Sequence, residues 1–289
     1  MHPYHGTRVA LATLHAKAQA IAPALQRHVG AIIEAVPVDT DALGTFSGER
    51  ERTAPAPAVC VAKARLGMQA AGLPYGMASE GSFGPHPLIP FVPGGAEWLA
   101  FVDDARGLVL VEECLADATN FSHLELGGDA PDPALDAWLE RVGFPAHAVL
   151  VRPAGVPAVD GAVPALVKGI VSPADLAHAV AGARRVSPRG VALVETDMRA
   201  HCNPTRMASI ASLAERLARR LAACCPACRA PGWGRVATTP GLACGWCGTP
   251  TALVLEETWG CTCCRHREGH PRADGRRTAD PGQCPSCNP

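Results

Sequence analysis

Four Cys-x-x-Cys pairs lie in the C-terminal part of this 289-residue chain and account for eight of its 13 cysteines. Each pair can place two thiolates on one metal ion, and a segment this short has too little core to fold without such support. Dense thiolate pairs in a sequence without a secretory signal favour metal binding over disulfides or a redox motif. The pairs are Cys225/Cys228, Cys244/Cys247, Cys261/Cys264 and Cys284/Cys287.

The spacing of the pairs predicts which of them share an ion. Fifteen residues separate Cys228 from Cys244, and 19 separate Cys264 from Cys284. Both gaps match the 15 to 20 residues that are typical of a structural zinc site, so we expect two Zn²⁺ ions in tandem zinc ribbons. An arrangement with the two inner pairs together and the two outer pairs together stays open. A closed four-thiolate site cannot activate water, so any chemistry is expected before residue 223.

Composition sets limits on the class of protein. With 48% hydrophobic residues and a formal net charge of −1, the chain has enough apolar side chains for a large core and no overall attraction to nucleic acid or anionic membranes. No signal peptide or membrane-spanning stretch is apparent, which predicts a cytoplasmic protein without a membrane partner. Lysine occurs only at Lys17, Lys63 and Lys168, and arginine elsewhere. Because an ammonium and a guanidinium are not interchangeable at a tight site, these lysines are candidates for function, although chance also explains them.

Apolar periodicity predicts strands and helices in alternation up to residue 222. We therefore expect an α/β fold with a mixed, largely parallel sheet flanked by helices, in one domain over 1–222, followed by a zinc-ribbon module over 223–289. A polar connector covers 39–57, and Ser172 and Asn203, each followed by proline, are expected to cap helices. The expected strands are 8–14, 31–38, one ending near 78, 97–102, 108–113, 147–151, 165–171 and 191–194; the helices are 17–28, 58–71, 133–141, one from 173, and 204–223.

Polar clusters follow three of the expected strands, over 13–17, 78–86 and 195–206. Ligands bind outside the carboxyl ends of strands in open α/β sheets, so these clusters are expected to meet at one crevice. The candidates for binding substrate or phosphate are Thr13, His15, Lys17, Ser79, Gly81, Ser82, Arg199, Asn203 and Arg206. The candidates for catalysis are Glu80, Glu195, Asp197 and His201.

Each group of carboxylates has a functional and a plain interpretation. Glu195 and Asp197 share a face if their strand continues, which would bring both to one Mg²⁺ ion, with Arg199 and Arg206 beside the phosphate. The plain alternative is a surface network of ion pairs among these four residues. Glu80 lies among small residues and glycines that would allow a ligand close to the backbone; its alternative is an exposed turn carboxylate.

Several phrases of the chain resemble an uncharacterised bacterial family, a domain of unknown function with a C-terminal double zinc ribbon. They are DTDALGTFSGE, AKARLGM, ASEGSFGPHP, ETDMRAHCNPTRM, CPAC and DPGQCPSCNP. This resemblance implies no activity.

A more distant resemblance concerns the order ATLHAK, AKAR, ASEGS and GFPAHAVLVRP, which is similar to the inosine triphosphate pyrophosphatase and Maf-like superfamily. It implies that Lys17 contacts phosphate, that Lys63 flanks the site from a helix, and that Glu80 is the metal-binding or base carboxylate. Gly143 and Phe144 would border a base pocket. His15 and His147 depart from the superfamily pattern, in which Asn and Asp are expected.

Together these features predict a Mg²⁺-dependent hydrolase of a nucleotide or related phosphorylated small molecule. The alternative is a non-catalytic protein whose zinc ribbons bind nucleic acid or a protein. The arginine-rich stretch from Arg265 to Arg277 favours this alternative, because it would offer a phosphate-binding loop.

Overall fold

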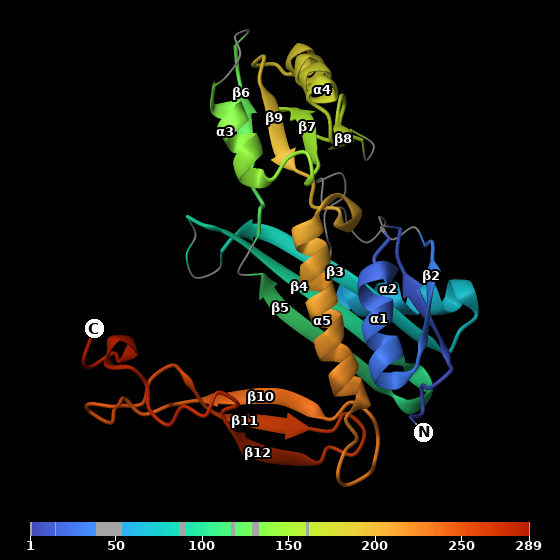
Figure 1. The fold of residues 1–289 in the computed structure, drawn as a ribbon, viewed down its shortest axis with the longest axis vertical. Coiled ribbons are helices and arrows are strands. Elements are labelled where there is room, and N and C mark those ends of the chain that lie inside the picture. The colour runs from blue at the N-terminus through green and yellow to red at the C-terminus, as the bar shows by residue number, and fades with distance from the viewer. Residues whose placement is uncertain are drawn as a thin grey trace.

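The computed structural model of the protein describes residues 2–14, 16–38, 54–86, 89, 91–116, 119–128, 133–159 and 162–288. In these residues the strands form three sheets, and helices pack against the first two (Figure 1). The predicted α/β class, with a mixed sheet, flanking helices and a C-terminal cysteine module, is confirmed. His15 and most of the expected connector, over 39–53, lie outside the described residues.

The first sheet has the strand order β2-β1-β3-β4-β5. β1 is parallel to both β2 and β3, whereas β3, β4 and β5 are antiparallel neighbours, so the parallel part is confined to one half. The strands are β1 (Arg8–Ala12), β2 (Ile32–Val36), β3 (Tyr75–Pro85), β4 (Pro93–Asp103) and β5 (Leu108–Ala116); the helices are α1 (Ala18–Val29), α2 (Ala56–Ala71) and α5 (Pro204–Ala222).

Helices cover both faces of this sheet because apolar side chains alternate along its strands. Leu11 and Met77 point to the face that α1 and α5 cover, and both are fully buried. Ala78 and Ala100 point to the opposite face, against α2. α5 is far from β5 in the sequence, yet its apolar side chains pack in the same core as those of α1 and the first sheet.

β3 is longer than the sequence predicts. The expected strand ended near Ala78 and led into a glycine-rich turn, but β3 continues to Pro85. The reason is antiparallel pairing with β4 along its whole length, from Tyr75 opposite Asp103 to Pro85 opposite Pro93. β1 pairs with β3 only as far as Met77, so residues after Ala78 have a strand neighbour on one side.

The second sheet, β6-β9-β7-β8, is antiparallel and has its own core within the region predicted as one domain. Trp138, Val149 and Leu176 pack in that core between the sheet and its two helices. Its strands are β6 (His123–Leu126), β7 (Val149–Pro153), β8 (Val167–Ile170) and β9 (Ala192–Thr196); its helices are α3 (Pro133–Val142) and α4 (Pro173–Val186).

The helix caps follow the sequence. The Ser172 side chain accepts a hydrogen bond from the Asp175 amide, and the Asn203 side chain accepts one from the Arg206 amide, which confirms both predicted N-caps. Pro173 and Pro204 each occupy the first turn of their helix. β6 had no counterpart among the predicted strands. Of the described helices, none is long and apolar enough to cross a membrane.

The C-terminal module is an antiparallel sheet of β10 (Gly234–Pro240), β11 (Val254–Gly260) and β12 (Arg267–Pro271). It follows α5 directly, and one end of its sheet lies by the C-terminus of α5, while the other end extends away from the first sheet (Figure 1).

Candidate functional site

Five charged side chains are buried together beyond the end of β1. Lys17 precedes α1, Lys63 lies on α2, Glu80 on β3, Glu97 on β4 and Arg206 in the first turn of α5. None of them is more than 8% exposed. We call these five residues the buried charged cluster. Four of them were predicted as site residues, and the fold brings them together from five separate segments.

Two ion pairs organise the buried charged cluster. The ammonium of Lys63 lies 2.7 Å from a carboxylate oxygen of Glu80, and Nε of Arg206 lies 2.5 Å from Oε1 of Glu97. Nη1 of Arg206 also donates to the carbonyl of Met198. Sequence reasoning missed Glu97, although a lone carboxylate within the apolar strand GGAEWLAFVD was a usable signal, because such a charge is seldom buried without a partner.

Lys17 occupies the edge of β3 that β1 leaves open. Its Nζ donates to the carbonyl of Ser79 at 3.1 Å, in place of the strand neighbour that ends beside Met77. Burial, reinforced by the positive charge of Arg206, lowers the pKa of Lys17 to about 8. The buried hydroxyl of Ser79 has no hydrogen-bond partner among the described residues. Lys17 therefore stabilises the strand edge and at the same time places a weakly held proton in a buried polar site.

Because Gly81 has no Cβ atom, the side chains of Arg206 and Glu97 can pack against its backbone. A Cβ atom at this position would lie 2.6 Å from Nη2 of Arg206 and 3.0 Å from each carboxylate oxygen of Glu97. The sequence predicted that this glycine admits a ligand to the backbone; in the structure it admits the Arg206–Glu97 pair. Burial raises the pKa of Glu97, although Arg206 opposes this effect. Ser82 is exposed on the other side of the strand.

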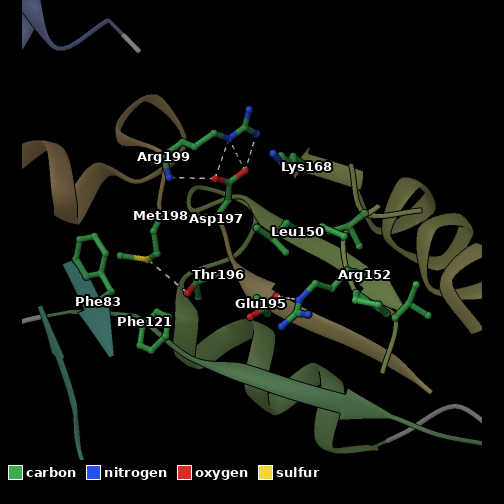
Figure 2. A pocket seen from close by; sticks show the side chains of 14 residues that line it. Phe83, Phe121, Leu150, Arg152, Lys168, Glu195, Thr196, Asp197, Met198 and Arg199 are labelled. Atoms are coloured by element: carbon green, nitrogen blue, oxygen red, sulfur yellow. Dashed lines mark hydrogen bonds and ion pairs between the residues drawn. The ribbon is translucent and has the colours of Figure 1, made fainter. Parts of the chain in front are cut away.

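Figure 2 shows the lining of a cavity of about 410 Å³. Two of its lining residues, Phe83 and Met198, contact Arg206 of the buried charged cluster. Its wall is formed by side chains of β7, β8 and β9 and by Phe83 of β3. This volume is in the range of small-molecule sites. The charged residues in its lining are Arg152, Lys168, Glu195, Asp197 and Arg199. We call it the inter-sheet cavity.

The two predicted metal carboxylates both line the inter-sheet cavity, but each has its own arginine. Glu195 accepts from Nε of Arg152 at 2.6 Å, and Asp197 accepts from the side chain and the amide of Arg199 and from the amide of Gly169 (Figure 2). Burial works to raise the pKa of Asp197, but its hydrogen bonds with Arg199 outweigh burial and hold the pKa below its usual range. For Asp197 and Arg199, this arrangement resembles the predicted alternative to a Mg²⁺ site, in which the carboxylates form ion pairs with arginines.

Two residues join the inter-sheet cavity to the buried charged cluster. Phe83 lines the cavity, and the guanidinium carbon of Arg206 lies 5.2 Å from the centre of its ring. Met198 also lines the cavity, and its carbonyl accepts from Arg206. The ends of β3 and β9 thus meet through Arg206. Glu80 is not among the residues that line the cavity.

The other predicted site residues have local roles. Asn203 is fully buried, caps α5 and donates to the side chain of Asn120 at 2.9 Å. The amide of Thr13 donates to the carbonyl of Val36 at 3.1 Å. His201 lies in a short 3₁₀ turn and is largely exposed. Partial burial of its ring lowers its pKa, and the positive charge of Arg199 adds to this effect. His147 contacts the hydroxyl of Thr205 at 2.8 Å.

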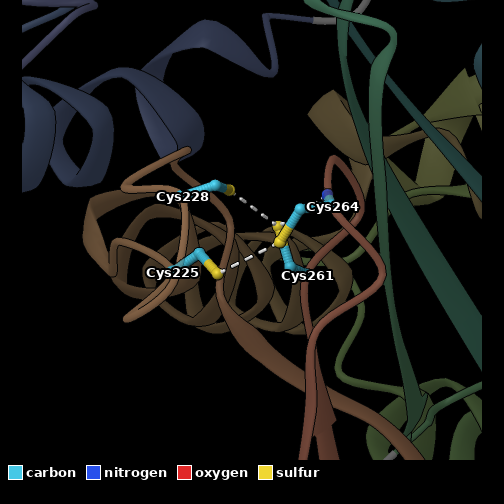
Figure 3. A group of neighbouring side chains, drawn as sticks. All are labelled: Cys225, Cys228, Cys261 and Cys264. Atoms are coloured by element: carbon cyan, nitrogen blue, oxygen red, sulfur yellow. Dashed lines mark hydrogen bonds between the residues drawn. The ribbon is translucent and has the colours of Figure 1, made fainter.

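The eight paired cysteines form two clusters of four thiols, in each of which all sulfur atoms lie within 4.8 Å of one another. In the first, Sγ of Cys225 lies 3.7 Å from that of Cys264, and Sγ of Cys228 lies 3.6 Å from that of Cys261 (Figure 3). A tetrahedral ion with bonds of about 2.3 Å separates its sulfur ligands by about 3.8 Å, whereas a disulfide needs about 2 Å. The clusters therefore have the geometry of metal sites.

The predicted sequential pairing is wrong, and so is the inner-and-outer alternative. The first cluster combines Cys225/Cys228 with Cys261/Cys264, and the second combines Cys244/Cys247 with Cys284/Cys287. The cause is the antiparallel sheet, because consecutive pairs are separated by one strand and lie at opposite ends of it. A strand of seven residues spans about 23 Å, too far for its two flanking pairs to share an ion. Two sites thus close the two ends of one three-stranded sheet.

The arginine-rich stretch from Arg265 to Arg277 is not a single loop. β12 runs through it, so Arg265 and Arg267 lie at one end of the module and Arg276 and Arg277 follow the other end. Arg272 is held by Asp274 at 2.5 Å and by the carbonyl of Val254. The arginines of this stretch therefore do not form one continuous surface loop.

Comparison with known proteins gave one result. A family model described as a domain of unknown function (DUF6671) matches residues 63–289, well over half of the chain. No curated protein and no solved structure matches the chain. The similarity to the inosine triphosphate pyrophosphatase and Maf-like superfamily therefore stays a prediction.

Proposed function

The chain belongs to the family described as a domain of unknown function (DUF6671), and from the chemistry of its candidate site we propose that it is a Mg²⁺-dependent hydrolase of a nucleotide or related phosphorylated small molecule. The observation that carries this proposal is the buried charged cluster. Taking charges out of water costs several kcal/mol per ion, and well-packed apolar side chains would stabilise the fold at least as well. Buried charge of this density is typical of sites that act on charged ligands.

The balance of charge favours an anionic substrate. Among the residues that the structure describes, the buried charged cluster has three cations, Lys17, Lys63 and Arg206, and two anions, Glu80 and Glu97, which gives these five residues one positive charge in excess. Burial is the main cause of the lowered pKa of Lys17, and the positive charge of Arg206 adds to it, whereas Glu97 and Glu80 oppose it. A phosphate oxygen would supply the missing negative charge, and the unpartnered Ser79 hydroxyl offers it a donor.

Each residue of the buried charged cluster and of the inter-sheet cavity has a separate chemical role in this proposal. Lys17 and Arg206 would neutralise phosphate, and Glu80, with Glu97 close by, would offer the hard oxygen ligands that Mg²⁺ prefers. Mg²⁺ would supply stabilisation of the charge that develops on phosphate oxygens. The inter-sheet cavity would hold the remainder of the substrate, with Glu195, Asp197 and Arg199 along its wall. Phe83, whose ring centre lies 5.2 Å from the guanidinium carbon of Arg206, would bring that remainder close to Arg206.

A nucleotide panel tests this proposal. The wild-type protein should release phosphate or pyrophosphate from at least one member only when Mg²⁺ is present. Glu80→Gln should lower the rate by about 10² or more, because the amide keeps the size and loses the charge. The matched control is Glu34→Gln, at an exposed carboxylate on β2 that pairs with Arg8. Thermal melting of both variants separates lost chemistry from lost folding. No Mg²⁺-dependent turnover, or full activity in a folded Glu80→Gln protein, would overturn the proposal.

For the cysteine clusters we propose structural Zn²⁺, one ion in each. Four thiolates without an open position are the usual ligand set of structural zinc, and reduced thiolates fit a cytoplasmic protein. Metal analysis of freshly purified protein should give close to two zinc ions per chain. A different metal, or none, would contradict this assignment.

A partner of the cysteine module is the second candidate function. Trp246, between two ligands of the second cluster, is 81% exposed, and the amide of the preceding Gly245 bonds to Ala279, two residues after Arg277. An exposed aromatic ring near Arg276 and Arg277 suits a nucleic acid or a protein. Trp246→Ala should then weaken capture of a single-stranded oligonucleotide; unchanged capture would argue against this surface.

A further inference from the structure

A groove of about 630 Å³ lies where the cysteine module meets β5 and α5. It is separate from both the buried charged cluster and the inter-sheet cavity. Three arginines of α5 lie on one wall, and Arg235 of β10 and Trp259 of β11 lie on the other. We call it the Trp–Arg groove. The α5 arginines are Arg216, Arg219 and Arg220.

Two of the α5 arginines are held in fixed positions by β5. Glu112 accepts from Arg216 at 3.0 Å and from Arg220 at 2.7 Å, and Arg216 also donates to the carbonyl of Glu113. One carboxylate thus orients two guanidinium groups and neutralises one of them. Among the described residues, the whole lining of the groove has four arginines and two carboxylates, those of Glu112 and Glu113.

The other two arginines are more exposed, and each is paired with a carboxylate on its own side of the groove. The Arg219 side chain is 68% exposed and pairs with Glu215 one turn earlier in α5, and the Arg235 side chain is 54% exposed and pairs with Glu257 on the neighbouring strand. Neither pair crosses the groove. Exposed pairs of this kind are worth about 0–1 kcal/mol, so a phosphate can compete for either guanidinium at little cost.

Trp259 provides an independent observation. Its indole N–H is buried and has no hydrogen-bond partner among the residues that the structure describes. Its ring lies on the groove wall and is partly exposed. The ring also packs against the ring of His270, with 5.2 Å between the two centroids, which holds it in place on the groove wall.

We propose that the Trp–Arg groove binds a nucleotide unit, either as a free nucleotide or within a single strand. The aromatic ring of Trp259 suits a base, and the exposed guanidinium groups of Arg219 and Arg235 suit phosphate. A groove of this size holds a nucleotide, and it lies at a junction between two parts of the fold, as ligand sites often do. This function is independent of the proposed hydrolase.

Fluorescence anisotropy of a labelled single-stranded oligonucleotide tests the proposal, with the zinc-loaded full chain at low salt and without Mg²⁺. ATP is then added as a competitor. The double variant Arg219→Gln/Arg235→Gln should weaken binding at least about tenfold and lower the salt slope by about 1.4, the value for two phosphate contacts on a single strand. The matched control is Arg8→Gln/Arg189→Gln, which removes two arginines that are 59% and 61% exposed and lie outside the groove, and it should bind as the wild type does.

The outcomes separate the sources of the nucleotide and the two proposed sites. Competition by ATP identifies free nucleotide as a ligand, and oligonucleotide binding without competition identifies a single strand; both support the groove. Binding must also persist in Glu80→Gln, which disables the hydrolase proposal and leaves the groove intact. The proposal is overturned if neither probe binds, if Arg219→Gln/Arg235→Gln binds like the wild type, or if the control loses affinity equally.

Discussion

The two cysteine clusters should differ in what they stabilise, although their ligand sets are the same. The first cluster lies at the end of α5: the carbonyl of Ala223, which caps that helix, accepts from the amides of Gly232 and Trp233 at 2.9 and 3.0 Å. Gly232 also lies so close to Leu108 and Leu110 of β5 that an added Cβ would be 3.1 to 3.3 Å from their methyl groups. The second cluster lies at the opposite end of the module's sheet, because Cys244 and Cys247 follow the end of β10.

Cys228→Ser should therefore weaken the first sheet as well as the module. Loss of the two hydrogen bonds at the helix end costs about 2 kcal/mol, and partial exposure of Leu108 and Leu110 costs a further 1–2 kcal/mol or so. A total of about 3–4 kcal/mol corresponds to a fall in Tm of about 6–15 °C for a domain of this size. Cys247→Ser, which removes an equivalent ligand of the second cluster, should lower that Tm by less than about 2 °C.

Far-ultraviolet circular dichroism measures this difference, because the described helices of eight or more residues all precede the module and dominate the signal. Metal analysis should show that each variant retains one of two ions, so that the comparison is between equal losses of metal. Equal Tm values for the two variants would refute the reasoning, since the first cluster would then have no special part in holding α5 against β5.

Three further predictions concern the buried charged cluster. Gly81→Ala should lower the free energy of unfolding by about 2 kcal/mol, because its Cβ would lie 2.6 Å from Arg206, whereas Gly84→Ala, with nothing within 4 Å, should be neutral or slightly stabilising in denaturant titrations. Glu97→Gln should cost about 3–5 kcal/mol by the same measurement, because it leaves Arg206 buried without its counter-charge; a loss below about 1 kcal/mol would speak against that pair. The pKa of Lys17 is about 8 in the folded protein, against an ordinary value of 10.5. Between these two pH values the Lys17 side chain binds a proton in the unfolded chain but not in the folded protein. The free energy of unfolding should therefore rise by about 3 kcal/mol from pH 8 to pH 10.5. Lys17→Met should remove this rise, and an unchanged pH profile would place the titration on another group.

The sequence by itself determined most elements and the composition of the metal sites. Apolar periodicity located the helices of both sheets, and Ser172 and Asn203 identified two helix starts, because these signals are local and depend on a few neighbouring residues. The spacing within each Cys-x-x-Cys pair is local too, so all eight thiols were correctly identified as members of two four-thiol clusters, although the predicted pairing of the motifs was wrong. Lys17, Glu80 and Arg206 were also predicted as site residues, because each lies in a polar cluster that follows an expected strand.

The tertiary structure decided which of these features meet. Which cysteine pairs share a cluster depends on the direction of strands, and an antiparallel sheet places alternate pairs, not consecutive ones, at the same end. β3 passes beyond Ala78 because β4 pairs with it, a contact that no local signal in the glycine-rich segment reveals. Glu97 and Arg206 are 109 positions apart, and only the packing of α5 on β4 makes them partners. Long-range contacts of this kind depend on the whole core, whereas caps, turns and metal-binding pairs depend on short stretches of chain.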